Sequence, residues 1–214
     1  MNSQTKEIVR ILPKKLISFA LNSLDKVAFV FINLHIGPNA LSVVAFLAGI
    51  GAGLLFFLEQ PFWAGISIII CGLFDGLDGK VAEHTNQKSL FGAIFDSTLD
   101  RYSEFFIYLG IAAHFRNHWA LWITFGTILG SSMVSYTRAR AEGLGIECKV
   151  GIMQRAERMV LLSLGAIAGS LIKIFDPAMI AVLVIIAIVS NITAIQRTFY
   201  VKKVEKQKKF REEA

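Results

Sequence analysis

The sequence predicts an all-α integral membrane protein with six transmembrane helices, preceded by an N-terminal interfacial amphipathic helix. Hydrophobic residues make up 54% of the 214 positions and charged residues only 18%, whereas about 25% of a soluble domain is charged. The mean hydropathy is +0.57. Uncharged apolar runs also recur near the length of about 20 residues that a helix needs to cross a bilayer. This composition excludes a disordered chain, a collagen-like chain and a disulfide scaffold.

The chain is expected to form a single membrane domain over residues 1–214, without a separate soluble domain. Its parts are an interfacial N-terminal helix in 1–36, a six-helix core over 37–200 and a basic cytoplasmic tail over 201–214. The predicted transmembrane helices are 41–58, 61–83, 90–114, 119–141, 154–173 and 177–200. The shorter apolar runs border clusters of charged residues, which must extend those helices to full length.

The N-terminal segment 16–34 is apolar enough to resemble a seventh span. Asp25 and Lys26 would then lie at the centre of the bilayer, where each charge costs about 2.5–3.5 kcal/mol. This cost favours a helix that lies in the membrane interface. Pro38 and Asn39, which follow a glycine, end this segment and begin the first span.

The distribution of basic residues supports six spans with the N-terminus inside. The three expected outer loops contain only Arg116 and Lys173 of the 22 lysine and arginine residues, and the net charge is +6. Basic residues concentrate in the cytoplasmic loops of membrane proteins, and a basic tail attracts anionic lipid headgroups. We therefore expect both termini to face the cytoplasm, with the chain in the cell (inner) membrane.

Four aspartates surround the turn between the second and third predicted spans. Asp75 and Asp78 are three residues apart, and Asp96 and Asp100 are four apart. These spacings place each pair on one face of a helix. Because a short polar turn joins the two helices, we expect them to be antiparallel neighbours, with all four carboxylates at one depth.

Four carboxylates at one site repel one another unless cations compensate them. Mg²⁺ prefers carboxylate oxygens and often shares them with substrate phosphates. The cluster therefore predicts a divalent-metal site. Gly79 and Gly92 lie beside it, where the missing side chain would let a phosphate approach the backbone.

The spacing of these residues resembles the signature of the CDP-alcohol phosphotransferase family. The match reads Asp75-x2-Asp78-Gly79-x2-Ala82-x9-Gly92-x3-Asp96-x3-Asp100. The six-span layout, the interfacial helix and the Pro38-Asn39 start of the first span are also similar to that family.

The resemblance implies two divalent ions per active site, Mg²⁺ or Mn²⁺, held by Asp75, Asp78, Asp96 and Asp100. These ions would hold the diphosphate of a CDP-linked lipid, and Asp100 would act as the general base. The implied contacts of that lipid are Pro38, Asn39, Asp78, Gly79, Ala82, Glu83, Lys88 and Gly92. The resemblance also implies a homodimer.

Glu83 departs from the family pattern, which usually has arginine at this position. The family arginine is thought to contact the diphosphate of the donor, so Glu83 replaces attraction with repulsion. Lys80 or Lys88 is a candidate to supply the missing positive charge.

The second half resembles the phosphatidylinositol-phosphate synthase branch in two runs, 135–142 (SYTRARAE) and 154–158 (QRAER). The resemblance implies that Arg138 and Arg155 hold the phosphate of the acceptor. Arg197 joins them only by its place near the end of the last span. Arginine suits phosphate because its donor fork matches two oxygens. The alternative is that these arginines are snorkelling anchors, or ion-pair partners of nearby glutamates.

The implied reaction is transfer of a phosphatidyl group from CDP-diacylglycerol to inositol 1-phosphate, giving phosphatidylinositol phosphate and CMP. Within the family, the alternatives are a phosphatidylglycerophosphate synthase, another polar acceptor or an ether-lipid donor. A divalent-cation transporter is the alternative from a different class, although transporters favour broken helices and internal repeats. Membrane lipids are expected partners, and nucleic acids are not.

Overall fold

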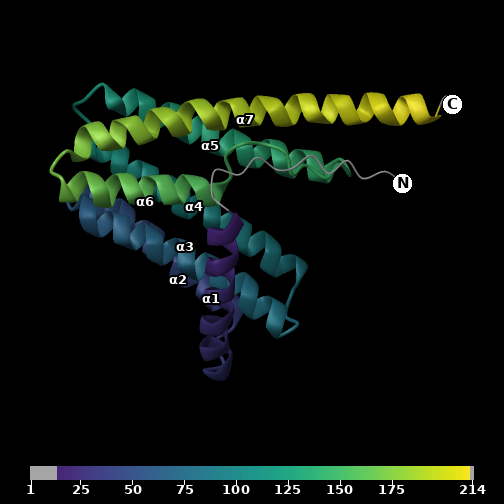
Figure 1. Ribbon diagram of the computed structural model, residues 1–214, viewed down its shortest axis with the longest axis horizontal. Helices are drawn as coiled ribbons and strands as arrows, with labels where there is room; N and C mark the ends of the chain where they lie inside the picture. Colours follow the sequence, from purple (N-terminus) through teal and green to yellow (C-terminus); the bar gives the residue numbers. More distant parts are fainter. Residues whose placement is uncertain (1–13, 213–214) are drawn as a thin grey trace.

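The computed structural model describes residues 14–212, with side chains over 24–207, and all regular secondary structure in this part is helical. Figure 1 shows an elongated bundle crossed by the first helix. The helices are α1 (Lys14–Asn33), α2 (Pro38–Phe57), α3 (Pro61–His84), α4 (Leu90–His114), α5 (Ala120–Gly143), α6 (Arg155–Leu171) and α7 (Phe175–Glu212).

The predicted spans agree with α2 to α6 to within three residues at each end. Proline occupies the first turn of both α2 and α3, where its fixed φ suits a helix start. The Ser89 side chain caps α4 by accepting from the Gly92 N–H at 2.9 Å. The last helix differs, because α7 continues to Glu212 and includes most of the predicted tail. Residues 1–13 of the predicted N-terminal segment lie outside the described residues.

The helices pack in a different order from the one the short turn suggested. α2 packs along both α3 and α4, α5 packs along α7, and α6 lies between α3 and α7. α3 and α4 make few direct contacts with each other. The expectation that these two helices pack as neighbours was therefore wrong, because α2 is the helix that holds both.

Glycines allow α2 and α4 to approach at backbone distance. A Cβ atom added at Gly110 would lie 2.5 Å from the Gly53 Cα, and one added at Gly49 would lie 3.0 Å from the Ser103 Cα. Small residues at helix crossings permit this kind of contact in membrane proteins. The crossing fixes α4, and therefore the position of its aspartates.

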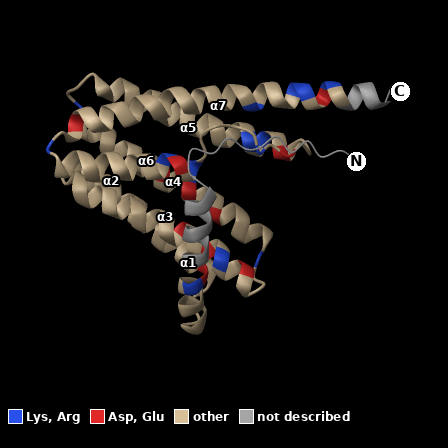
Figure 2. Cartoon of the chain, in the orientation of Figure 1, with Lys and Arg blue, Asp and Glu red and all other residues tan. Residues whose placement is uncertain are grey.

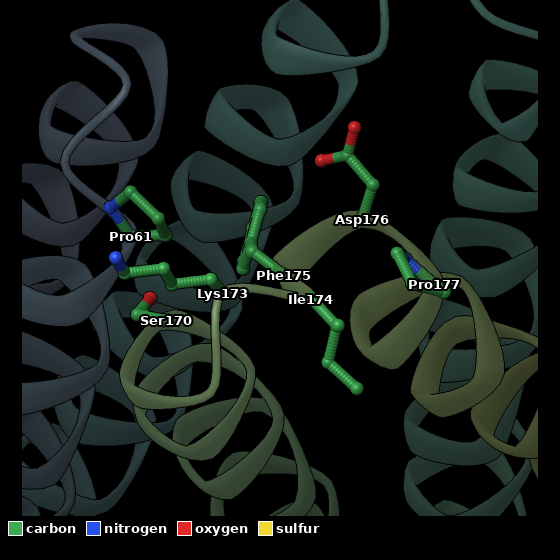
Figure 3. A pocket seen from close by; sticks show the side chains of 7 residues that line it. All are labelled: Pro61, Ser170, Lys173, Ile174, Phe175, Asp176 and Pro177. Carbon is green, nitrogen blue, oxygen red and sulfur yellow. The ribbon is translucent and has the colours of Figure 1, made fainter.

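The three predicted outer loops meet at one end of the bundle. His114, at the end of α4, contacts Asp176 of α7 at 2.9 Å, and the Phe56 and Phe175 rings stack at 6.0 Å. A recess of about 460 Å³ lies at this end. Figure 3 shows the residues that line it: Pro61, Ser170, Lys173, Ile174, Phe175, Asp176 and Pro177. Asp75 lies about 21 Å further along α3 at 1.5 Å per residue. The recess is therefore separate from the aspartates.

Charged residues gather at the opposite end. Figure 2 shows them near α1, around the α3–α4 turn and along the last turns of α7.

By length and hydropathy, three helical stretches of the described chain qualify as membrane spans: Pro38–Phe57, Pro61–His84 and Phe175–Gln207. α6 is only 17 residues long, and α4 contains charged residues along its length.

α1 crosses the bundle at its charged end and packs on α3 (Figure 1). Asp25 pairs with Lys80 at 2.9 Å and with a ring nitrogen of His84 at 3.2 Å. Val27 and Val30 expose 44% and 55% of their surfaces, which leaves an apolar face beside these charged contacts.

The contact between α1 and α3 should weaken in acid. Hydrogen bonds from Lys80 and His84 hold the pKa of the Asp25 carboxyl below its ordinary value of 3.8. A lowered pKa means that the contact is fully present above the unfolded-state pKa and is lost as pH falls through the folded-state value. The protection factors of the α1 amides, which correct for the slower intrinsic exchange in acid, should therefore fall below about pH 4. Asp25→Asn should remove this pH step; a step that persists in the variant would assign it to another group.

Candidate active site

Three of the four predicted aspartates converge between α3 and α4. Asp75, Asp96 and Asp100 each offer a carboxylate oxygen, and these oxygens all lie within 4.8 Å of one another. The Asp75 and Asp100 side chains are 28% and 18% exposed. The cluster is thus partly shielded from water and still open on one side.

Asp78 lies beside this group and is held by a neighbouring helix. It is 5% exposed, it accepts a hydrogen bond from the Ser42 hydroxyl at 2.5 Å, and it lies within electrostatic range of Asp75 and Asp96. Sequence reasoning missed Ser42. Its place one turn after Pro38 and Asn39, at the start of α2, was the available signal.

The donor set fits a divalent cation. Oxygen-only ligands from several carboxylates suit Mg²⁺ and Mn²⁺. The three clustered aspartates alone are close enough to share one ion, and Asp78 adds a fourth carboxylate at the edge. Arg155 balances only part of the repulsion among these carboxylates. A bound cation would relieve the rest.

Arg155 extends from the start of α6 into the carboxylate cluster. Its Nη1 lies 2.7 Å from Asp75 Oδ2 and 3.0 Å from Asp100 Oδ1. Its Nε and Nη2 are buried and have no hydrogen-bond partner among the described residues. One nitrogen therefore contacts the carboxylates, while two donors stay available.

The other two predicted phosphate-binding arginines contact groups other than the aspartates. Arg138 is exposed and pairs with Glu142 at 2.9 Å, which is the ion-pair alternative that the sequence had left open. Arg197 is 3% exposed and donates to the carbonyl oxygens of Val150 and Val134. Arg197 thus anchors the α5–α6 loop and α5 to α7.

Of the two glycines beside the cluster, Gly79 borders open space and Gly92 is closely packed. A Cβ atom added at Gly79 would meet none of the described residues within 4 Å. One added at Gly92 would meet the Ser89 Oγ at 3.0 Å and the Asn39 Oδ1 at 3.6 Å. Asn39 of α2 and Gly92 of α4 therefore face each other, and Pro38 begins the turn that carries Asn39.

The lysines near Glu83 already have partners. Lys88 pairs with Glu83 itself at 3.4 Å, with side chains 67% and 55% exposed, whereas Lys80 is held by α1. Glu83 and the half-buried Ala82 lie in the last turn of α3. Lys88 thus neutralises Glu83 in this structure instead of presenting a free positive charge.

Sequence reasoning also missed Glu104, which lies one turn beyond Asp100 on α4 and pairs with the buried Arg158 of α6. An ionisable residue inside a predicted span was a usable signal, because such residues in membrane helices are generally functional. No sequence pattern identified its partner, which comes from a helix about fifty residues further along the chain.

Residues 35–193 match the sequence profile of the CDP-alcohol phosphatidyltransferase family. Archaetidylinositol phosphate synthase of Pyrococcus horikoshii is 36% identical over 181 residues, covering 84% of this chain and 91% of that protein. Phosphatidylinositol phosphate synthase of Cutibacterium acnes is 32% identical over 149 residues, covering 67% and 72%. The chain belongs to the CDP-alcohol phosphatidyltransferase family.

Two crystal structures of phosphatidylinositol phosphate synthase from Mycobacterium tuberculosis share the fold. The one with CDP-DAG bound has a TM-score of 0.75 at 27% identity and covers 83% of this chain and 92% of its own. The complex with manganese and citrate has a TM-score of 0.76 at 26% identity and covers 83% and 88%.

The protein is therefore an integral membrane enzyme of phospholipid synthesis. Membership of this family replaces the alternative interpretation as a divalent-cation transporter, which the four aspartates alone also allowed. The aspartate cluster and the manganese-bound neighbour together indicate that the enzyme uses a divalent metal.

Proposed function

We propose that this enzyme transfers the phosphatidyl group of CDP-diacylglycerol to inositol 1-phosphate, releasing CMP and phosphatidylinositol phosphate. The observation that carries the proposal is the convergence of three carboxylates with an arginine that keeps two donors free. The carboxylates suit a metal-bridged diphosphate, and the arginine suits a second phosphate. The names of the relatives from Pyrococcus and Cutibacterium both denote synthases of an inositol phosphate lipid.

The proposed topology follows from the positions of the substrates. Lipid tails stay in the bilayer, while CDP and a sugar phosphate come from water. In the proposed six-span arrangement, a cluster at the charged end of the bundle (Figure 2) reaches both. We propose that this end and both termini face the cytoplasm of the cell (inner) membrane, that α1 lies in the interface, and that the enzyme is a homodimer.

For the donor, we propose two ions, Mg²⁺ or Mn²⁺, held by Asp75, Asp78, Asp96 and Asp100. Such ions, when bound, neutralise the diphosphate and stabilise the departing CMP. The Ser42 hydrogen bond orients Asp78. The other proposed donor contacts surround the glycine side of the cluster: Pro38, Asn39, Gly79, Ala82, Glu83, Lys88 and Gly92.

For the acceptor, we propose that the free Nε and Nη2 of Arg155 bind its phosphate. We propose that Arg138 and Arg197 bind the same phosphate from the side away from the aspartates. Asp100 accepts the proton of the attacking hydroxyl. The hydroxyl oxygen bonds to the lipid-bearing phosphorus, and the bond from that phosphorus to the CMP oxygen breaks in the same displacement. Since acceptor and leaving group exchange directly, no covalent enzyme intermediate is needed.

The test is release of CMP by the purified enzyme with Mg²⁺ and CDP-diacylglycerol. Inositol 1-phosphate, inositol and glycerol 3-phosphate are compared as acceptors, and an ether-linked CDP-lipid is compared as donor. Inositol 1-phosphate should give the highest kcat/KM. Faster turnover with glycerol 3-phosphate would identify a phosphatidylglycerophosphate synthase, and no CMP with any acceptor would refute the transferase proposal.

Arg155→Ala should raise the KM for inositol 1-phosphate more than the KM for the CDP-lipid. Losing charge-assisted hydrogen bonds of about 1.5–3 kcal/mol corresponds to a factor of roughly ten to a hundred. Steady-state kinetics with each substrate varied in turn measures the two constants. Lys149→Ala is the control, because this surface lysine pairs with Glu147 in the α5–α6 loop. An unchanged dependence on inositol 1-phosphate in Arg155→Ala would remove Arg155 from the acceptor site.

A further inference from the structure

A second arginine–carboxylate pair lies one helical turn beyond the candidate active site. Arg158 is 0% exposed and Glu104 is 4% exposed. Arg158 Nε and Nη2 donate to the two carboxylate oxygens of Glu104 at 2.6 and 2.8 Å. The Tyr108 hydroxyl lies 3.4 Å from Glu104 Oε1 and 3.1 Å from Ser131 Oγ, so the pair is also connected to α5.

The two pairs are in register on the same two helices. Asp100 and Glu104 share one face of α4, and Arg155 and Arg158 share one face of α6, because their spacings are four and three residues. α6 packs chiefly on α3 and α7, whereas α4 packs chiefly on α2 and α5. The Arg155–Asp100 and Arg158–Glu104 pairs therefore link two helices whose main packing partners differ.

The Glu104–Arg158 pair is much more constrained than the Arg155–Asp100 pair. A bidentate fork between guanidinium and carboxylate permits a narrow range of orientations, and complete burial excludes competing water. The Arg155 side chain, by contrast, is 13% exposed and uses only Nη1 in its two contacts.

We propose that the Glu104–Arg158 pair positions Arg155. It holds the first turn of α6 against α4 so that Arg155 reaches Asp75 and Asp100 with Nε and Nη2 still free. Glu104 and Arg158 would be positioning residues, since both are buried and bind each other rather than the carboxylate cluster. The acceptor part of this inference rests on the proposed function; the placement of Arg155 at the carboxylates does not.

The key variant is the double substitution Glu104→Gln with Arg158→Gln. Either single substitution leaves a buried charge without its partner and risks unfolding the protein, whereas the double variant removes both charges. Gly165→Ala is the matched control, because its Cβ would meet Val182 Cγ2 at 2.8 Å. That control loosens α6 against α7 without altering the pair.

The first measurement needs no turnover. Mn²⁺ binding to the purified proteins is followed by electron paramagnetic resonance, with Arg155→Gln as the reference for a lost guanidinium. Removing a positive charge beside the carboxylates should tighten Mn²⁺ binding about tenfold in Arg155→Gln. The double variant should shift the Mn²⁺ Kd in the same direction by about threefold or more, and Gly165→Ala should not. A wild-type Mn²⁺ Kd in a folded double variant would overturn the proposal.

The second measurement separates this inference from the proposed function. The double variant should raise the KM for inositol 1-phosphate about tenfold and leave the KM for the CDP-lipid within about twofold. Acceptor KM at the wild-type value would refute the positioning role. Lack of CMP release by the wild-type enzyme would instead refute the proposed function, and the Mn²⁺ measurement would still decide where Arg155 lies.

Discussion

Asp100→Asn should lower kcat by about a thousandfold, since a positioned general base contributes a factor of about 10² to 10⁴. The substitution keeps the size of the side chain and removes the oxygen that would accept the proton of the acceptor. The KM for the CDP-lipid should change little, because Asp75, Asp78 and Asp96 remain to hold the metal. Single-turnover CMP release, together with equilibrium binding of the CDP-lipid, measures the two effects separately.

Asp100 also contacts Arg155 at 3.0 Å, so a loss of activity has two possible structural causes. Mn²⁺ binding and thermal stability of Asp100→Asn show whether the site is still assembled. Asp176→Asn is a suitable control, because it removes a carboxylate that pairs with His114 at the opposite end of the bundle. Retained turnover in Asp100→Asn would exclude Asp100 as the base, and lost Mn²⁺ binding would make it chiefly a metal ligand.

The parts of the fold that could be predicted are those encoded locally. Pro38 and Pro61 mark helix starts, and Ser89 with Gly92 marks the start of α4. The spacing of the aspartates identified the cluster before any geometry was known, because positions three and four apart on a helix always share a face.

The parts that could not be predicted depend on which helices pack together. The short α3–α4 turn suggested direct packing, but the Gly53–Gly110 crossing brings α2 against α4 instead. The same long-range packing determines the partner of each charge. Arg155 therefore reaches Asp75 from a helix 80 residues away in sequence, and Arg158 is paired by Glu104. No local pattern specifies either contact.

Gly110→Ala should destabilise the protein by about 3 kcal/mol, the upper part of the usual range for overpacking. The added Cβ would lie 2.5 Å from the Gly53 Cα and closer still to its carbonyl oxygen. Backbone atoms cannot rotate aside as a side chain can, so α4 must move away from α2. Since α4 carries Asp96 and Asp100, the metal site should be lost together with stability.

Gly126→Ala on α5 is the matched control, because a Cβ atom there would meet no atom within 4 Å in the part of the chain that the structure describes. Replacing a helical glycine by alanine without a clash stabilises a helix by roughly 0.5–1 kcal/mol. Thermal unfolding in detergent should therefore shift down for Gly110→Ala and stay level or rise for Gly126→Ala, with Mn²⁺ affinity falling only in the former. Equal melting temperatures in the two variants would mean that α2 and α4 do not cross at backbone contact, and that another feature holds the aspartates in place.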